Sequence, residues 1–221
     1  MMLRTTILKA VVTAALAVGL LILFGGWIDR WPLRFDRALL AGLRRPDDMA
    51  VPIGPANLLA FMRDMTALGD GNILTLVVLA VTGFLLVQRK RLTAVLVAAA
   101  TVSGSTLGAW AKLYTARARP DVVPHLVDVS SLSFPSAHAA NSAIIYLTIA
   151  AVVSQAIVGR GARTYMIACA VLLVTLIGVS RIYLGVHWPS DVLAGWSFGV
   201  LWACSWWWAG ARMHDRMPTE G

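Results

Sequence analysis

Charged residues are scarce in this chain, making up 14% of its 221 residues, whereas about a quarter of an ordinary soluble domain is charged. Cysteine is scarce too. Cys169 and Cys204 each lie within a long apolar stretch, where a thiol is more often a small hydrophobic group than a ligand or a disulfide partner. The lack of charge excludes an ordinary soluble domain. What is abundant is apolar: 58% of the residues are hydrophobic, as is typical of an integral membrane protein.

No Gly/Ser-rich linker, repeat or low-complexity tract divides the sequence, so we expect residues 1–221 to form a single domain. The 19 Lys and Arg exceed the 11 Asp and Glu, which gives a formal net charge of +8. Most of these cations flank apolar stretches. Such a distribution favours membrane lipids and an anionic substrate as partners, and it argues against nucleic acid.

Six stretches are long and apolar enough to cross a membrane core, which needs about 20 helical residues. We therefore predict an all-α bundle of six transmembrane helices. The first stretch resembles a signal peptide, but cleavage after its small residues would leave too short a hydrophobic region, so we expect an uncleaved anchor. The six stretches are approximately residues 10–28, 71–87, 92–111, 139–158, 164–180 and 192–210.

The loops predict the orientation of the chain. An even number of spans places both termini on one side, together with the tight Arg-rich loops 88–91 and 159–163. Because short cytoplasmic loops carry an excess of Lys and Arg, we expect cytoplasmic termini. Separately, we expect a location in a bacterial inner (plasma) membrane. The long connection 29–70 then lies on the extracytoplasmic side. Apolar residues at helical spacing in 35–43 and 58–68 predict two short interfacial helices there, which we expect to cap the bundle rather than to gate a substrate.

Polar residues concentrate in three short segments at the ends of apolar stretches, residues 112–120, 135–138 and 180–191. An ionisable side chain deep in a bilayer costs about 2.5–3.5 kcal/mol on insertion scales, so a cluster of them requires a reason. At the positions singled out below, the three segments supply three cations, a hydroxyl, two histidines and a carboxylate. This set of groups is suited to phosphate chemistry.

In the first segment, Lys112 and Arg119 are seven residues apart. If the third span continues through Ala118, both side chains share one helix face about two turns apart and could hold one phosphate. Pro120 would then end the helix. The alternative is a basic stretch whose side chains extend to lipid headgroups.

The second segment, Pro-Ser-Ala-His at 135–138, comes directly before the fourth apolar stretch. Ser136 is a favoured helix N-cap, and the free N–H groups and positive dipole end of a helix start attract anions. Ser136 and the amide of Ala137 could therefore hold phosphate oxygens, while His138 could transfer a proton. Taken alone, the pattern is also compatible with an ordinary helix start.

In the third segment, His187 precedes Pro189, a residue suited to the first turn of a helix, and Asp191 follows His187 by four residues. A carboxylate at that spacing could bind one imidazole nitrogen and leave the other free to attack, although a structural His–Asp pair would look the same. Arg181 follows Ser180 and would offer a planar pair of donors to phosphate oxygens.

The order and spacing of these segments resemble the three-part signature of the phosphatidic acid phosphatase type 2 superfamily, which includes membrane lipid phosphatases and vanadium-dependent haloperoxidases. The resemblance implies His187 as the nucleophile, Asp191 as its orienting partner and His138 as the general acid. One position departs from the family pattern, since Ala137 stands where glycine is usual, which matters only if the amide needs a positive φ. The resemblance implies these phosphate-binding residues: Lys112, Arg119, Ser136, Ala137 and Arg181.

We therefore expect a lipid phosphate or diphosphate phosphatase that acts through a phosphohistidine at the extracytoplasmic face. No cofactor is expected, and no metal, because the site segments lack aspartates at metal-ligand spacing. Undecaprenyl diphosphate, phosphatidylglycerol phosphate, phosphatidic acid and lipid A phosphates carry similar headgroup charge and fit equally well. The alternatives are a phosphotransferase that uses the same residues and a non-catalytic carrier of anionic lipids; a haloperoxidase fits least, because that branch is soluble.

Overall fold

The computed structural model describes residues 19, 23–25, 33–156 and 159–214 of the chain. The first expected span, residues 10–28, and the anchor expected there lie almost entirely outside this part. The long helices that follow are α4 (Gly71–Val87), α5 (Arg91–Thr115), α6 (Ala137–Ala156), α7 (Arg160–Tyr183) and α8 (Pro189–His214). These helices correspond, within a few residues at each end, to the second to sixth expected spans.

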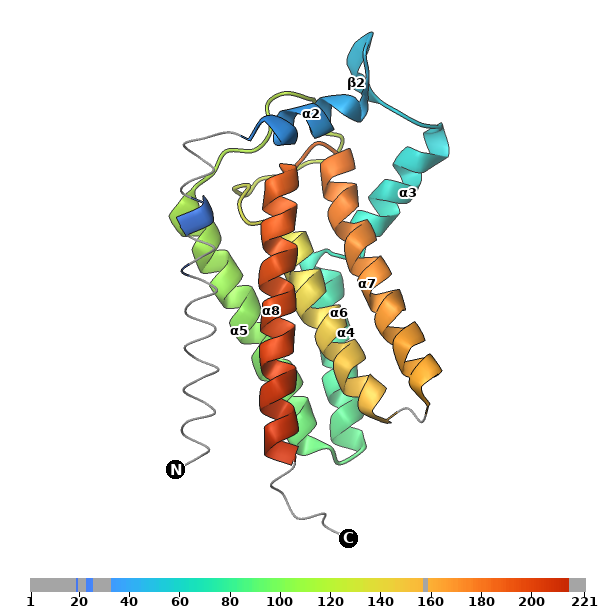
Figure 1. Ribbon diagram of the computed structural model, residues 1–221, viewed down its shortest axis with the longest axis vertical. Helices are drawn as coiled ribbons and strands as arrows, with labels where there is room; N and C mark the ends of the chain where they lie inside the picture. The colour runs from blue at the N-terminus through green and yellow to red at the C-terminus, as the bar shows by residue number, and fades with distance from the viewer. Residues whose placement is uncertain (1–18, 20–22, 26–32, 157–158, 215–221) are drawn as a thin grey trace.

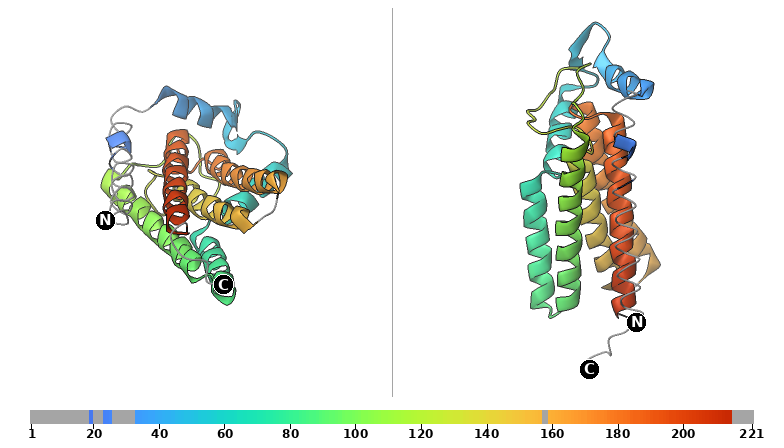
Figure 2. Two further views of the ribbon diagram at one scale, coloured as in Figure 1. Left: turned by 60° about the horizontal axis from the view of Figure 1, so that its bottom comes forward. Right: turned by 90° about the vertical axis from the view of Figure 1, so that its left-hand side faces the viewer.

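The long helices run side by side along the long axis of the molecule, with α6 near the middle of the bundle (Figures 1 and 2). Helix α6 packs against α4, α5, α7 and α8. Two glycines of α8 allow its close approach to α6. A Cβ at Gly195 would lie 2.8 Å from the carbonyl oxygen of Ser136, and one at Gly199 would lie 2.8 Å from that of Ala140. This contact holds the start of α8 against the start of α6, where two of the polar segments lie.

Helices α5, α6 and α7 are each long and apolar enough to cross a membrane. Helix α3 (Ala56–Ala67) and α4 meet at an angle of 51° and satisfy the same criteria as one broken span. The described part of the chain therefore contains three candidate spans, or four with the bent pair. Helix α8 has 26 residues but is not among the helices that meet these criteria.

Residues 34–67 cover one end of the bundle, at the top of Figure 1. Helices α2 (Arg34–Gly42) and α3 lie where two short helices are predicted. Between them, β1 (Arg44–Arg45) and β2 (Asp48–Pro52) form an antiparallel hairpin that the sequence did not predict. Helix α2 turns Asp36 and Leu40 inward, whereas Phe35 and Leu39 of its apolar stripe are exposed.

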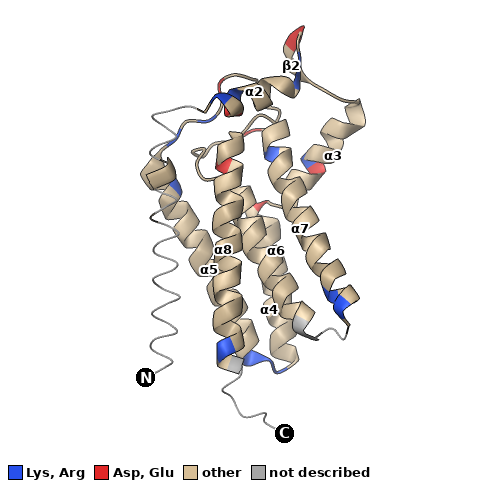
Figure 3. Ribbon diagram, viewed as in Figure 1, with Lys and Arg blue, Asp and Glu red and all other residues tan. Residues whose placement is uncertain are grey.

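Charged residues gather near the two ends of the bundle and leave the middle apolar (Figure 3). In the described part of the chain, the end opposite the hairpin carries only Lys and Arg, in the α4–α5 loop, at the start of α7 and near the end of α8. The end nearest the hairpin carries both signs of charge. The three polar segments lie at that second end.

Candidate active site

A cavity of about 450 Å³ lies where the three polar segments meet. Of the eight residues predicted to form the site, six line the cavity, and the other two, Ser136 and Asp191, are fully buried beside it. Residues of α3, of the α3–α4 junction and of the loop 127–131 complete the wall. The six lining residues are Lys112, Arg119, Ala137, His138, Arg181 and His187.

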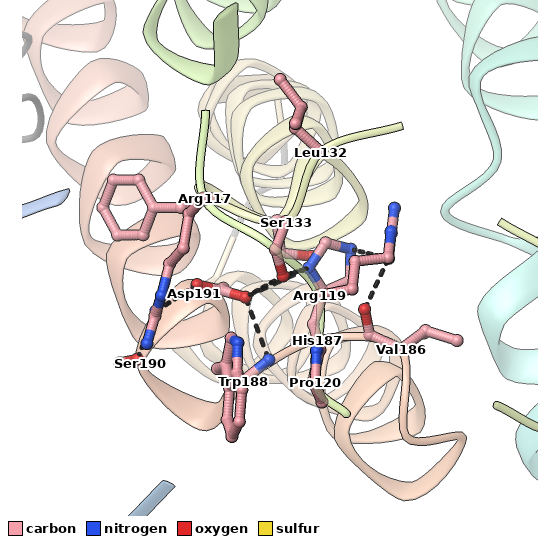
Figure 4. A network of polar contacts seen from close by, with 12 residues as sticks. Arg117, Arg119, Pro120, Leu132, Ser133, Val186, His187, Trp188, Ser190 and Asp191 are labelled. Carbon is pink, nitrogen blue, oxygen red and sulfur yellow. Dashed lines mark hydrogen bonds and ion pairs between the residues drawn. The ribbon is translucent and has the colours of Figure 1, made fainter. Parts of the chain in front are cut away.

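His187 lies in the short turn between α7 and α8 and is 1% exposed. Its Nδ1 faces the carboxylate of Asp191 at 3.5 Å, and its Nε2 lies 3.3 Å from Nη1 of Arg119 (Figure 4). Burial lowers the pKa of the His187 imidazole well below its usual range, and the charges of Arg181, Arg119 and Lys112 lower it further. The ring is therefore neutral near pH 7, so one nitrogen carries a free lone pair.

Asp191 occupies the first turn of α8, which begins at Pro189 as the sequence predicted. Its Oδ2 accepts hydrogen bonds from the Trp188 N–H at 2.9 Å and from the Ser133 hydroxyl at 2.5 Å (Figure 4). Because 3.5 Å exceeds a hydrogen-bond distance, the predicted His–Asp pair is a close electrostatic contact. The Ser133 hydroxyl also lies 3.5 Å from His187 Nδ1, so Ser133 contacts both members of the pair. The sequence did not predict this role for Ser133.

Lys112 and Arg119 do not share a helix face, contrary to the prediction. Helix α5 ends at Thr115, and Ala116 adopts the left-handed conformation with φ 50°, so Pro120 plays no part in ending it. Arg119 reaches the cavity from the following loop, where its Nε donates to the carbonyl oxygen of Ser131 at 2.6 Å. Both cations nevertheless meet in the cavity, since Lys112 Nζ donates to the neighbouring carbonyl of Leu132 at 2.7 Å.

The second segment forms the predicted helix start. Ser136 directly precedes α6, and its hydroxyl lies 3.5 Å from the Ala139 N–H, a long contact for a cap. Its own N–H donates to the main-chain oxygen of Asp191 at 3.1 Å, which ties the second segment to the third. Ala137 is the first residue of α6 and is not among the described residues with positive φ, so alanine fits where the family usually has glycine.

Arg181 lies in the last turn of α7 and is almost fully buried at the cavity. Its Nη1 donates to the Thr66 hydroxyl of α3 at 2.8 Å, while its buried Nε has no partner among the described residues. Thr66 gave no signal in the sequence, because a lone threonine in an amphipathic helix is common. Arg181 thus adds a third cation, held from a different helix, with donor capacity left for a ligand.

The cavity is suited to an anion with several oxygens. Three cations from three elements and the two imidazoles of His138 and His187 line it, while Asp70 and Asp128 lie at its wall. In the described part of the chain, no group of three His, Cys, Asp or Glu side chains is placed to hold a metal ion. Cations of this kind, with Arg181 buried and Lys112 and Arg119 half-buried, match the geometry and charge of phosphoryl oxygens.

A membrane helix bundle with such a cavity is typical of membrane proteins that bind and process phosphate esters. Residues 91–214 match the PAP2 superfamily, a stretch that contains all three polar segments. The chain belongs to this superfamily of membrane lipid phosphatases, as its signature predicted. By this homology it is a lipid phosphate phosphatase, a hydrolase, and an integral multi-pass membrane protein.

Two relatives of known activity are similar over most of this region. Phosphatidylglycerophosphatase B of Bacillus subtilis is 33% identical over 141 residues, which cover 63% of this chain and 69% of the relative. Decaprenylphosphoryl-5-phosphoribose phosphatase of Mycobacterium tuberculosis is 32% identical over 146 residues, covering 65% and 75%.

A solved structure shares the fold. The crystal structure of the transmembrane PAP2 type phosphatidylglycerolphosphate phosphatase from Bacillus subtilis aligns with a TM-score of 0.70 and 24% identity, over 99% of this chain and 98% of that one.

Proposed function

We propose that this protein is a metal-independent phosphatase of lipid phosphates or diphosphates that works through a phosphohistidine on His187. The observation that carries the proposal is the placement of the two ring nitrogens. Nδ1 faces a carboxylate, which favours the tautomer with its proton there, and Nε2 faces the cavity with its cations. A carrier that only binds anionic lipids has no need of a histidine held in this way.

In the proposed first step, Nε2 of His187 attacks phosphorus, and the bond between phosphorus and the lipid oxygen breaks. His138 in its protonated form gives its proton to the departing oxygen, so a lipid alcohol or a lipid monophosphate leaves. Lys112, Arg119 and Arg181 offset the charge on the phosphoryl oxygens, and one donor of this kind is typically worth about 10²–10³ in rate. Arg119 exchanges its contact with Nε2 for the phosphate.

In the second step, a water molecule attacks the phosphohistidine and gives a proton to His138. The phosphorus–nitrogen bond breaks, inorganic phosphate leaves, and both histidines return to their starting states. Asp191 stays ionised throughout and keeps the Nδ1–H of His187 oriented. The only acceptor required is water, so an alcohol in its place would make the same site a phosphotransferase.

We also propose that residues 1–221 form one domain of six spans with cytoplasmic termini and an extracytoplasmic site. The Arg-rich loops at the bundle end opposite the cavity support this orientation (Figure 3), because short cationic loops favour the cytoplasmic side. Likeness to the whole length of a transmembrane phosphatase supports the single domain. The substrate would then be a phosphate exposed at the outer surface of a bacterial inner membrane.

The names of the two relatives place their substrates among phospholipids and prenyl-linked lipids. We propose a lipid-linked phosphate of the same kind here, with undecaprenyl diphosphate and phosphatidic acid among the candidates. The cavity fits the phosphate and leaves the lipid portion open. Each candidate presents the same phosphoryl group to the three cations.

Release of inorganic phosphate from a panel of lipid phosphates by the purified protein tests the proposal. We expect release to persist in the presence of chelator and to be lost in His187→Ala. His125→Ala is the matched control, since His125 lies outside the cavity and contacts the Pro120 carbonyl at 2.9 Å. Activity in His187→Ala, or its loss with chelator, would refute the mechanism. Transfer of phosphate to an added alcohol without release would identify a transferase.

A further inference from the structure

Behind the candidate site, one buried cation bridges two buried carboxylates. Arg117 Nη1 lies 2.6 Å from Asp191 Oδ1, and its Nη2 lies 3.3 Å from Asp36 Oδ2. All three residues are at most 4% exposed. The guanidinium also stacks over the Trp188 ring, with Cζ 5.5 Å from its centroid. Asp36 lies outside the three polar segments, and Arg117 lies within the first segment but is not among the predicted site residues.

Ser190 closes this network around the start of α8. Its N–H donates to Asp36 Oδ1 at 2.8 Å, and its hydroxyl donates to Asp36 Oδ2 at 2.6 Å. The same hydroxyl accepts from Arg117 Nη1 at 2.9 Å (Figure 4 shows the Arg117, Ser190 and Asp191 side). Asp36 of α2 thus binds the first turn of α8 from outside, as a capping carboxylate does.

A buried ionic network of this kind contributes little net stability to a fold. Removing charges from water costs several kcal/mol per ion, and well-packed apolar residues often serve equally well. Helix α2 already packs by Leu40 in an apolar cluster with Val123 and Trp188. However, the network includes Asp191, the carboxylate that faces His187. This contact suggests that the network has a role in the chemistry.

We infer that Asp36 and Arg117 are positioning residues that orient Asp191 and preserve its negative charge toward His187. Arg117 holds Oδ1, so that Oδ2 is directed at Nδ1 of the imidazole. Asp36 also pairs with Arg117. Without Asp36, the whole positive charge of Arg117 would be balanced by Asp191, and less negative charge would be left to face His187. The inference rests on the proposed function, because it assigns these residues to the support of a nucleophilic His187.

Asp36→Asn tests the inference with little change in shape. The amide oxygen still accepts the Ser190 N–H, but the negative charge is gone. We expect phosphohistidine formation, followed by rapid quench, to slow by about 10-fold with KM unchanged, the lower end of the effect seen when a metal-binding histidine loses its hydrogen-bond partner. Asp47→Asn is the control, since Asp47 lies on the exposed hairpin in a 3.7 Å pair with Arg45.

A double-mutant cycle separates positioning from folding. If Asp36 acts through Asp191, adding Asp36→Asn to Asp191→Asn slows phosphohistidine formation no further. An unchanged rate in Asp36→Asn, or the same loss in both backgrounds, would overturn the inference. Should Asp36→Asn fail to fold, Arg117→Lys takes its place in the cycle, because it keeps the charge but cannot reach both carboxylates. An inactive wild type would instead refute the proposed function.

Discussion

Gly69 lies at the break between α3 and α4, directly behind His138, and the replacement Gly69→Ala should displace that histidine. A Cβ at this position would lie 2.5 Å from Cγ2 of Ile177 and 3.1 Å from Cδ2 of His138. Neither contact is tolerated without movement, and overpacking of this kind costs about 1–3 kcal/mol. For a chain of this length, that loss corresponds to a decrease in Tm of about 2–12 °C.

The same clash should reduce the rate. A misplacement of about 1 Å in a reacting group costs about 10²-fold, so a shift of a few tenths of an ångström in His138 should lower kcat by about 5–10-fold. The assay is phosphate release from a lipid phosphate in detergent, with Tm measured on the same samples. Gly71→Ala is the matched control, because no atom lies within 4 Å of its Cβ position at the start of α4. A Gly69→Ala protein with wild-type kcat and Tm would refute the placement of the α3–α4 junction against His138.

Three further outcomes are expected. His138→Ala should be severely impaired on alkyl phosphates but much less so in forming the phosphoenzyme from p-nitrophenyl phosphate, whose leaving group needs no proton; equal loss in a rapid-quench experiment would contradict the general-acid role. Burial lowers the pKa of His187 in the folded protein, so below about pH 6.5 the unfolded chain binds a proton at this residue that the folded protein does not bind. The contribution of His187 to stability is therefore present above about pH 6.5 and is lost as the pH falls below that value. Thermal unfolding from pH 7.5 to pH 5 should therefore show a smaller loss of Tm in His187→Gln than in wild type, and equal losses would contradict a buried neutral imidazole. Finally, with the two native cysteines replaced, a cysteine at exposed Asp121 should react with an impermeant maleimide in intact cells and one at exposed Gly161 should not; the reverse pattern would place the site on the cytoplasmic side.

The sequence was sufficient to find six of the residues that line the cavity, because each motif combines a charge or an imidazole with a helix boundary. Pro189 starts α8 and thereby places Asp191 one turn from His187. Ser136 precedes α6 in the same way. Spacing within a segment is a local property, and local geometry decides such contacts.

The path of the chain after α5 was not predictable in this way. The spacing of seven positions from Lys112 to Arg119 fits a continuous helix, but the chain leaves the helix at Ala116. Alanine is a strong helix former, so nothing in its identity marks a helix end. Both cations still reach the cavity because the loop 116–133 folds back over it, held by hydrogen bonds from Arg119 to Ser131 within the loop and to Val186 before α8.

The residues that support His187 were missed for a related reason. Asp36 lies among charged residues in a helix with an apolar stripe, a pattern that predicts an exposed side chain, yet it is 1% exposed. Its partners Arg117 and Ser190 are more than 80 residues away in sequence. A buried ion pair between such distant positions leaves no periodic signal in a single sequence.

The most direct test of the account is to trap the covalent intermediate. Purified protein is mixed with a lipid phosphate carrying labelled phosphorus, quenched within milliseconds in alkali, and digested to locate the label. The account predicts a base-stable, acid-labile phosphohistidine at His187 that forms in wild type and in His125→Ala and is absent in His187→Ala. Label on another residue, or turnover of the lipid phosphate with no labelled protein at any time, would contradict it.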